Sequence, residues 1–220
     1  MRLKSNDFDM NCIEMAKFLL GKVLVRQLED NTFLRGKIVE TESYLGGIDK
    51  ASHSFNGRTP RNAPMFMKEG TAYVYMTYGM YHCFNISSRE PGAAVLIRAL
   101  EPLEGLDIMH KHRLNKVKNK QAFKSLKDID LCNGPSKLCI SMDIHKDNCN
   151  KLNLCDNDLL WLESFPNFNE TLNIVTAKRI GIDSAGEEWA NKPLRFYIFG
   201  NPHVSKRNRT AEKLIELPTT

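Results

Sequence analysis

The segment from Gly36 to Arg98 contains the side chains whose chemistry is most informative. It holds two neighbouring carboxylates, five of the six tyrosines, two histidines and several arginines. A carboxylate can act as a general base, and an aromatic face can stack on a flat ring or attract a cationic one. This inventory predicts a pocket that holds a flat ring between aromatic side chains and moves a proton beside it.

Glu40 and Glu42 are the candidate acid–base groups. They lie two residues apart near the end of a predicted strand, so an extended chain places both on one face. A lone carboxylate at a strand end is usually a surface charge, and the pair by itself selects no reaction. Arg98 interrupts a strongly apolar strand, and a buried arginine requires an anionic or polar partner.

The tyrosines gather on two predicted strands, residues 71–77 and 81–87, with Tyr78 in the turn between them. The period of two places Tyr73 and Tyr75 on the same face. Such a stripe is typical of cross-strand packing as well as of a binding wall. An exposed Tyr78 at the tip of the hairpin, beside basic residues, would suit a wedge between base pairs.

Residues 46–68 are rich in Gly, Pro, Asn and charge, which predicts a long loop. His53 in this loop is either a solvent-exposed side chain or a hydrogen-bonding wall of the pocket. Arg58, Arg61 and Lys68 follow it and could contact phosphates.

The remaining pattern predicts the elements that must position these side chains. A helix is expected over residues 11–20, where Gly21 stops it, and another begins at Gly134. The other expected elements are strands over 22–28, 33–41, 93–100, 159–162, 173–176 and 194–199, and a helix over 103–114. We therefore expect a single α+β domain over residues 1–220, with a mixed, mainly antiparallel, curved sheet flanked by helices.

Composition excludes several classes of protein. The chain has 220 residues, of which 42% are hydrophobic, and no apolar run is long enough to cross a membrane. Its first residues lack the pattern of a secretory signal. The six cysteines form no CxxC pair, so we expect reduced thiols packed as small hydrophobic side chains in an intracellular protein.

The net charge of +5 is unevenly distributed: residues 111–127 carry seven lysines or arginines and no acid. This excess favours a polyanionic partner, although a solvated basic loop explains it equally well. The sequence contains no GxGxxG after a strand, GxxxxGK[ST], HExxH or GxSxG. The missing motifs argue against a dinucleotide-binding protein, an ATP-binding protein or a zinc hydrolase. We expect no cofactor and no metal.

Together these segments resemble the alkyladenine (3-methyladenine) DNA glycosylase family. The resemblance covers roughly residues 8–206. The motifs that carry it are VETESYLG (39–46), HSFNGRTPRN (53–62), MFMKEGTAYVYMTYGMYHCFNIS (65–87), VLIRALEPLEG (95–105), LCNGPSKLC (131–139), RIGI (179–182) and KPLRFYIFGNPHVS (192–205).

The resemblance implies a monofunctional base-excision-repair enzyme. It would flip alkylated or deaminated purines out of duplex DNA and hydrolyse the N-glycosidic bond, leaving an abasic site. The implied lesions are 3-methyladenine, 7-methylguanine, hypoxanthine and ethenoadenine. The partner would be double-stranded DNA and not a membrane, and the protein would be a monomer. It would be found in the nucleus of a eukaryote or in the cytoplasm and nucleoid of a bacterium.

The resemblance also assigns expected roles to residues. Glu42 would be the general base. Arg98 would help to hold the attacking water or a nearby phosphate, and the Ile180 carbonyl would orient that water. Tyr44 and Tyr75 would sandwich the base. His53 would contact the edge of the base, Asn85 would exclude guanine, and Tyr78 would fill the gap in the duplex. The DNA surface would be lined by Thr59, Arg61, Met80, Tyr81 and Gly181.

Two alternatives stay open. One is a non-catalytic lesion-binding protein that keeps the pocket, against which an intact Glu42 and Arg98 argue. The other is an unrelated small-molecule enzyme, such as a one-carbon transferase, against which an exposed Tyr78 and a basic surface argue.

Overall fold

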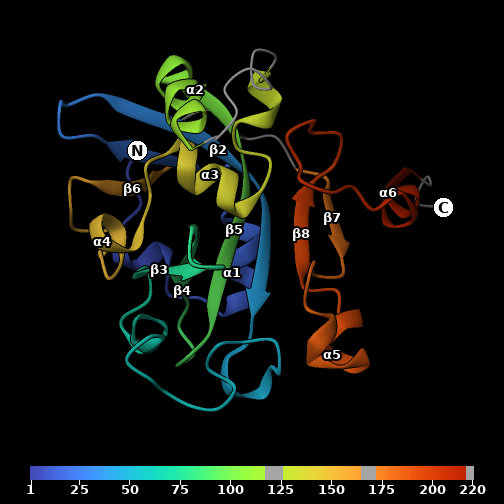
Figure 1. Ribbon diagram of the computed structural model, residues 1–220. Coiled ribbons are helices and arrows are strands. Elements are labelled where there is room, and N and C mark those ends of the chain that lie inside the picture. Colours follow the sequence, from blue (N-terminus) through green and yellow to red (C-terminus); the bar gives the residue numbers. More distant parts are fainter. Residues whose placement is uncertain (117–125, 165–171, 217–220) are drawn as a thin grey trace.

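The computed structural model describes residues 1–116, 126–164 and 172–216 (Figure 1). The chain enters the fold through α1 (Cys12–Phe18), whose buried face carries Cys12, Met15 and Ala16. Asn11 caps this helix by accepting a hydrogen bond from the Glu14 N–H at 2.9 Å. The helix is shorter at both ends than the sequence predicts, because Asn11 is its cap and the chain turns away before Gly21.

Eight strands form one sheet in the described residues. They are β1 (Val23–Gln27), β2 (Phe33–Tyr44), β3 (Ala72–Thr77), β4 (Tyr81–Ser87), β5 (Ala94–Glu104), β6 (Leu160–Glu163), β7 (Ile174–Ala177) and β8 (Arg195–Ile198). The order is β3-β4-β5-β2-β1-β6, and β8 joins β2 to β7. Every pairing between these strands is antiparallel. This confirms the predicted α+β class and the mainly antiparallel sheet, while the parallel pairs of a mixed sheet do not occur among the described strands.

β2 is the strand on which the site is built. It pairs with β5 along one edge; along the other it pairs first with β1 and then, at residues 40–42, with β8. The register with β5 shifts on both sides of Glu40, and such irregularities bend a strand. β2 continues to Tyr44, three residues beyond the predicted end, so Glu42 lies inside the strand with neighbours on both edges.

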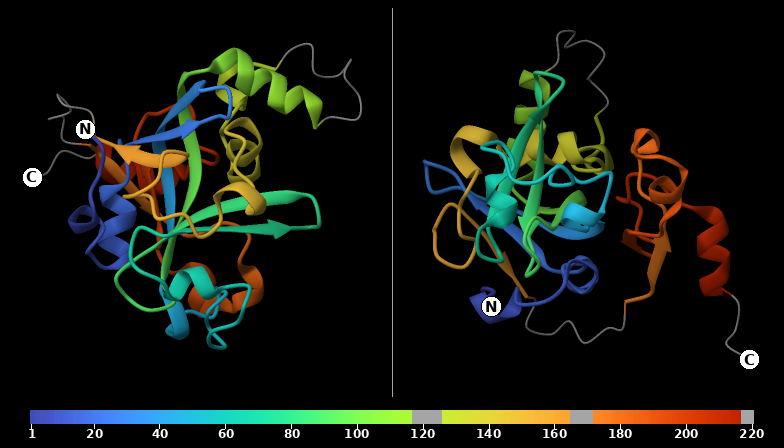
Figure 2. Two further views of the ribbon diagram at one scale, coloured as in Figure 1. Left: turned by 90° about the vertical axis from the view of Figure 1, so that its left-hand side faces the viewer. Right: turned by 90° about the horizontal axis from the view of Figure 1, so that it is seen from below.

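β3 and β4 form the predicted hairpin, with Thr77 paired to Tyr81. The Met80 N–H donates to the Thr77 carbonyl at 3.3 Å, and both Tyr78 (φ 51°) and Gly79 (φ 67°) have positive φ. This combination fits a type I′ turn, whose twist suits a two-stranded ribbon. The left view of Figure 2 shows the hairpin extending away from the body of the molecule.

The helices pack around the sheet. The structure has α2 (Leu106–Asn115), α3 (Pro135–Ser141), α4 (Lys146–Cys149), α5 (Glu187–Asn191) and α6 (Arg209–Glu216). α1 contacts β2 and β5, while α3 contacts β4 and β5. The predicted start of the second helix at Leu103 is wrong, because β5 continues to Glu104. Gly105, in a left-handed conformation (φ 79°), separates this strand from α2.

The main hydrophobic core joins α1, α3 and the sheet, with Phe8, Leu19, Ile38 and Phe84 fully buried. A second cluster, around Tyr197, lies among β7, β8 and α6. All six cysteines are free thiols; five are buried, as predicted for small hydrophobic side chains. Residues 117–125 of the basic segment lie outside the described residues.

Two features are absent from the described residues. No helix there is long and apolar enough to cross a membrane. No group of three or more His, Cys, Asp or Glu side chains in that part of the chain is arranged to hold a metal ion.

Candidate active site

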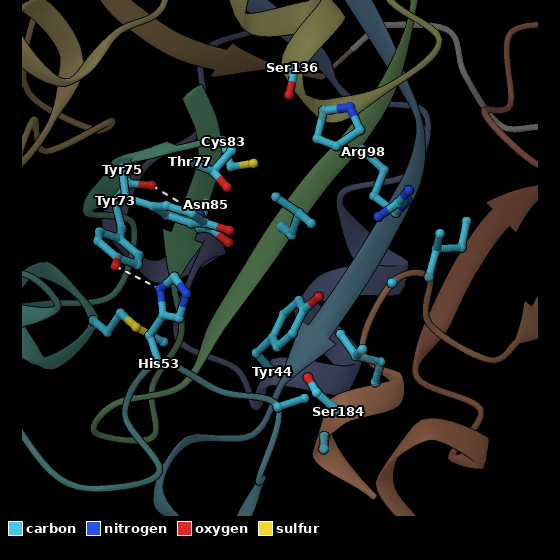
Figure 3. A pocket seen from close by; sticks show the side chains of 18 of the residues that line it. Tyr44, His53, Tyr73, Tyr75, Thr77, Cys83, Asn85, Arg98, Ser136 and Ser184 are labelled. Carbon is cyan, nitrogen blue, oxygen red and sulfur yellow. Dashed lines mark hydrogen bonds between the residues drawn. The ribbon is translucent and has the colours of Figure 1, made fainter. Parts of the chain in front are cut away.

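A cavity of about 450 Å³ opens between the β3–β4 hairpin, β2, β5 and the loop after β7. This volume is within the range of small-molecule and base pockets. Nine of the residues singled out from the sequence line it: Tyr44, His53, Tyr73, Tyr75, Tyr78, Asn85, Arg98, Ile180 and Gly181. Figure 3 shows Tyr44 on one side, with Tyr73, Tyr75 and His53 across from it.

The tyrosines form a connected aromatic wall. Tyr73 and Tyr75 share a face of β3 as predicted, with ring centroids 5.3 Å apart. Burial raises the pKa of Tyr73 to about 12 and also raises the pKa of Tyr75. Both phenols therefore stay protonated at physiological pH and can donate hydrogen bonds.

His53 stands at the mouth of the cavity against this wall. Its Nδ1 lies 2.9 Å from the Tyr73 hydroxyl, and its ring meets the Tyr75 ring edge-on at 4.5 Å between centroids. The protein packed around the ring, followed by the charge of Arg61, lowers the pKa of His53. The imidazole is therefore neutral at pH 7, and Nε2 is the ring nitrogen left for a ligand.

The loop that carries His53 is organised by Asn62, which the sequence analysis did not single out. The buried Asn62 side chain donates to the carbonyls of His53 (2.8 Å) and Gly57 (3.0 Å). Its oxygen accepts the N–H of Thr59 at 2.6 Å. Thr59 itself is exposed beside the cavity, not within it.

Glu42 lies behind the cavity wall and is fully buried. Its Oε1 accepts the backbone N–H of Ile180 at 2.9 Å and forms an ion pair with Arg98 Nη1 at 3.2 Å. Its Oε2 accepts the Tyr44 hydroxyl at 2.9 Å. Burial, then the charge of Glu42, raises the pKa of Tyr44 well above its usual value, so Tyr44 is the donor. Glu42 is thus fixed by three groups that line the cavity.

Arg98 has the anionic partners that its burial requires. Besides Glu42, its Nε lies 3.4 Å from Glu40 Oε1. Burial disfavours the charged guanidinium, but Glu42 and Glu40 outweigh this effect and raise the pKa of Arg98. Both carboxylates therefore lie on the Arg98 side of β2, as the spacing predicted.

A buried ion pair connects the segment after β2 with the segment after β7. Arg179 makes a bidentate contact with Asp49, at 2.5 and 2.9 Å, and neither side chain is exposed. The Arg179 guanidinium also donates to the Ser43 carbonyl at 2.9 Å and lies 4.7 Å from the centre of the Tyr44 ring. This pair was not predicted, since 130 positions separate its members.

The tip of the hairpin exposes apolar side chains. Tyr78 is 88% exposed, and Met80 and Tyr81 are exposed beside it. A bulky residue with positive φ is strained, and such strain is commonly found at functional sites. Arg61 lies against the hairpin, with Nη2 3.3 Å from the Met76 carbonyl and its guanidinium 5.6 Å from the centre of the Tyr75 ring. Met80, Tyr81 and Arg61 flank the cavity but do not line it.

Comparison with known proteins identifies the family of this chain. The family model described as "Methylpurine-DNA glycosylase (MPG)" matches residues 6–202. Two mammalian proteins named "DNA-3-methyladenine glycosylase" are similar to this chain. The one from Mus musculus is 52% identical over 97% of this chain and 64% of its own length. The one from Homo sapiens is 51% identical over 96% of this chain and 70% of its own length.

A relative from Clostridium tetani is 47% identical over 94% of this chain and over its entire own length. The chain thus spans about two thirds of the length of the mammalian relatives and matches the clostridial one from end to end. On the family model and these identities, the chain belongs to the methylpurine-DNA glycosylase family.

Proposed function

We propose that this protein is a DNA glycosylase of base excision repair that flips a damaged purine out of duplex DNA and hydrolyses its N-glycosidic bond. The observation that carries the proposal is Glu42, a buried carboxylate held by Tyr44, Arg98 and the Ile180 N–H directly behind an aromatic cavity. Membership of the methylpurine-DNA glycosylase family supports the same reading. The proposed substrates are 3-methyladenine, 7-methylguanine, hypoxanthine and ethenoadenine.

The cavity supplies what a flipped purine needs. Tyr44 and Tyr75 offer aromatic faces on opposite sides, and stacking on them also attracts a cationic alkylated base. His53, whose Nδ1 faces Tyr73, is left with Nε2 for the edge of the base. A neutral His53 avoids repulsion with a cationic base, which fits its lowered pKa.

The chemistry follows from the position of Glu42. A carboxylate offers about four acceptor positions, and the described contacts with Tyr44, Ile180 and Arg98 use three of them. A water on the remaining Oε2 position, steered by Arg98 and the Ile180 carbonyl, would attack C1′ of the sugar. Glu42 takes the proton of the water, the hydroxyl bonds to C1′, and the base leaves with the electron pair of the broken bond. The carboxylate also stabilises the positive charge that develops on the sugar.

The exposed surface around the cavity suits duplex DNA. Tyr78 would occupy the gap left by the flipped nucleotide. Met80 and Tyr81 would contact the neighbouring bases, and Arg61, Thr59 and the backbone at Gly181 would contact the DNA strands. We propose that the active protein is a monomer. It would act where the cell keeps its DNA, in the nucleus of a eukaryote or the nucleoid of a bacterium.

Tyr78→Ala tests the wedge. Removing the ring forfeits base stacking worth about 1–3 kcal/mol, so lesion binding should weaken by roughly tenfold or more. The measurement is the dissociation constant for a duplex with one lesion, together with the single-turnover excision rate. Tyr78→Phe keeps the ring and should behave like wild type. Wild-type binding and excision by the alanine variant would disprove the wedge role.

Asn85→Ser tests the exclusion of guanine. The buried Asn85 lines the cavity, and its Nδ2 donates to the Tyr73 carbonyl at 3.1 Å, which fixes the side chain. A fixed amide would clash with the 2-amino group of guanine, which hypoxanthine lacks. 7-Methylguanine also carries this group, but its positive charge makes it a good leaving group and offsets the clash. The smaller serine should raise the ratio of guanine to hypoxanthine excision on the order of tenfold. An unchanged ratio would remove this role from Asn85.

A duplex oligonucleotide carrying one hypoxanthine tests the proposed function. Wild type should produce strand breaks only after alkali, because a monofunctional glycosylase leaves an intact abasic strand. Breaks without alkali would contradict the monofunctional mechanism. Tight binding without excision, on this duplex and on a methylated one, would favour the non-catalytic lesion-binding protein. Absence of salt-dependent duplex binding would favour the small-molecule enzyme.

A further inference from the structure

Glu40 lies outside the cavity but belongs to the same chain of charges as Glu42. It is fully buried on β2, and its Oε1 contacts both Arg98 (3.4 Å) and Arg195 Nη1 (2.7 Å). Its Oε2 accepts the backbone N–H of Ser205 at 2.7 Å. The result is a buried row in which Arg195, Glu40, Arg98 and Glu42 alternate in sign.

The far end of this row is anchored to the backbone. Arg195 on β8 donates through Nε to the Lys178 carbonyl at 2.9 Å and through Nη1 to the Lys206 carbonyl at 2.7 Å. Glu40 is therefore held from two sides. Among the residues that the structure describes, Arg98 Nε has no partner with hydrogen-bond geometry, and it meets Glu40 as an ion pair. Charge, rather than a directed hydrogen bond, couples Glu40 to Arg98.

We propose that Glu40 is a positioning residue that acts through Arg98 to keep Glu42 an effective base. The inference rests on the proposed function. Arg98 contacts both carboxylates, so Glu40 takes up part of the positive charge that would otherwise act on Glu42 alone. With Glu40 neutral, Arg98 would stabilise the ionised form of Glu42 more strongly, and an overstabilised carboxylate is a poorer proton acceptor.

The sign of the expected effect is fixed by Coulomb's law. Loss of the negative charge at position 40 favours ionised Glu42, so the acid limb of the pH–rate profile moves to lower pH. Loss of the positive charge at position 195 leaves the negative charge of Glu40 less neutralised. This disfavours ionised Glu42, so the acid limb of the pH–rate profile moves to higher pH. The other titratable groups near Glu42 stay in place in both variants: Tyr44 on β2, Cys83 on β4, Arg98 on β5 and Arg179 after β7.

The test compares Glu40→Gln and Arg195→Gln with wild type in single-turnover excision of hypoxanthine from pH 5 to 9. We expect the Glu40→Gln acid limb about one pH unit lower, with the plateau rate reduced roughly tenfold. The Arg195→Gln acid limb should move the opposite way. Glu40→Asp retains the charge and should keep the acid limb near that of wild type. Lesion binding and thermal melting of each variant measure the folded fraction.

The outcomes separate this inference from the proposed function. A merely structural Glu40 predicts that both neutral variants lose folded protein while the acid limb of the remaining activity stays at the wild-type pH. That result overturns the inference. Displacement of the acid limbs of Glu40→Gln and Arg195→Gln in the same direction also overturns it. If one neutral variant fails to fold, the direction of the other still decides. Absence of excision by wild type would instead overturn the proposed function.

Discussion

Replacing Glu42 by Gln is expected to lower the single-turnover excision rate about 10³-fold while lesion binding stays close to wild type. Gln has the shape of Glu: its oxygen can accept the Ile180 N–H while its NH2 group donates to the Tyr44 hydroxyl oxygen, so the cavity keeps its walls. It cannot take a proton from water or stabilise positive charge on the sugar. Binding and chemistry should therefore separate in this variant.

The control for this experiment is Glu101→Gln. Glu101 lies on β5, is partly exposed and pairs with Lys37 at 2.7 Å, outside the cavity. Its loss should leave the excision rate within about twofold of wild type, because surface ion pairs contribute little. An excision rate for Glu42→Gln equal to that of Glu101→Gln would show that Glu42 is not the base.

Asp49→Ala should have the largest effect on stability. It removes the carboxylate that pairs with Arg179 and that also accepts the N–H groups of Leu45 (3.0 Å) and Ala51 (3.0 Å). Breaking a buried ion pair from one side typically costs about 3–5 kcal/mol, since the other charge stays buried without its partner. For a chain of this size that corresponds to a fall in Tm of about 10 °C.

The same variant should disturb the aromatic wall, because Arg179 is held against the Tyr44 ring by this pair. Lesion binding measured well below Tm should therefore weaken as well. Glu188→Ala provides the control: it breaks an exposed pair with Lys192, and the expected change is within about 0.5 kcal/mol. Equal melting temperatures for Asp49→Ala and Glu188→Ala would contradict the structural role assigned to Asp49.

The parts of the site that local sequence predicts are those built from neighbouring residues. The Tyr73 and Tyr75 stripe, the Tyr78 tip and the common side of Glu40 and Glu42 follow from the period of a strand and from a two-strand turn. The need of Arg98 for anionic partners follows from its apolar surroundings. In each case, one short segment contains the whole pattern.

The parts that were not predicted depend on contacts between distant segments. Arg179 with Asp49, and Arg195 with Glu40, join residues 130 and 155 positions apart, and no periodicity links them. The length of β2 was underestimated because its second half is completed by β8, near the end of the chain. The short helices α4 and α5 are similarly positioned by tertiary packing rather than by a long apolar pattern.

The most direct test of the central claim is to measure free hypoxanthine released from a duplex with one lesion, by wild type and by Glu42→Gln side by side. We expect wild type to release one free base for every abasic site formed, and Glu42→Gln to bind the duplex but release essentially none in the same time. Equal release by both proteins, or abasic sites without free base, would contradict hydrolysis by a water that Glu42 activates.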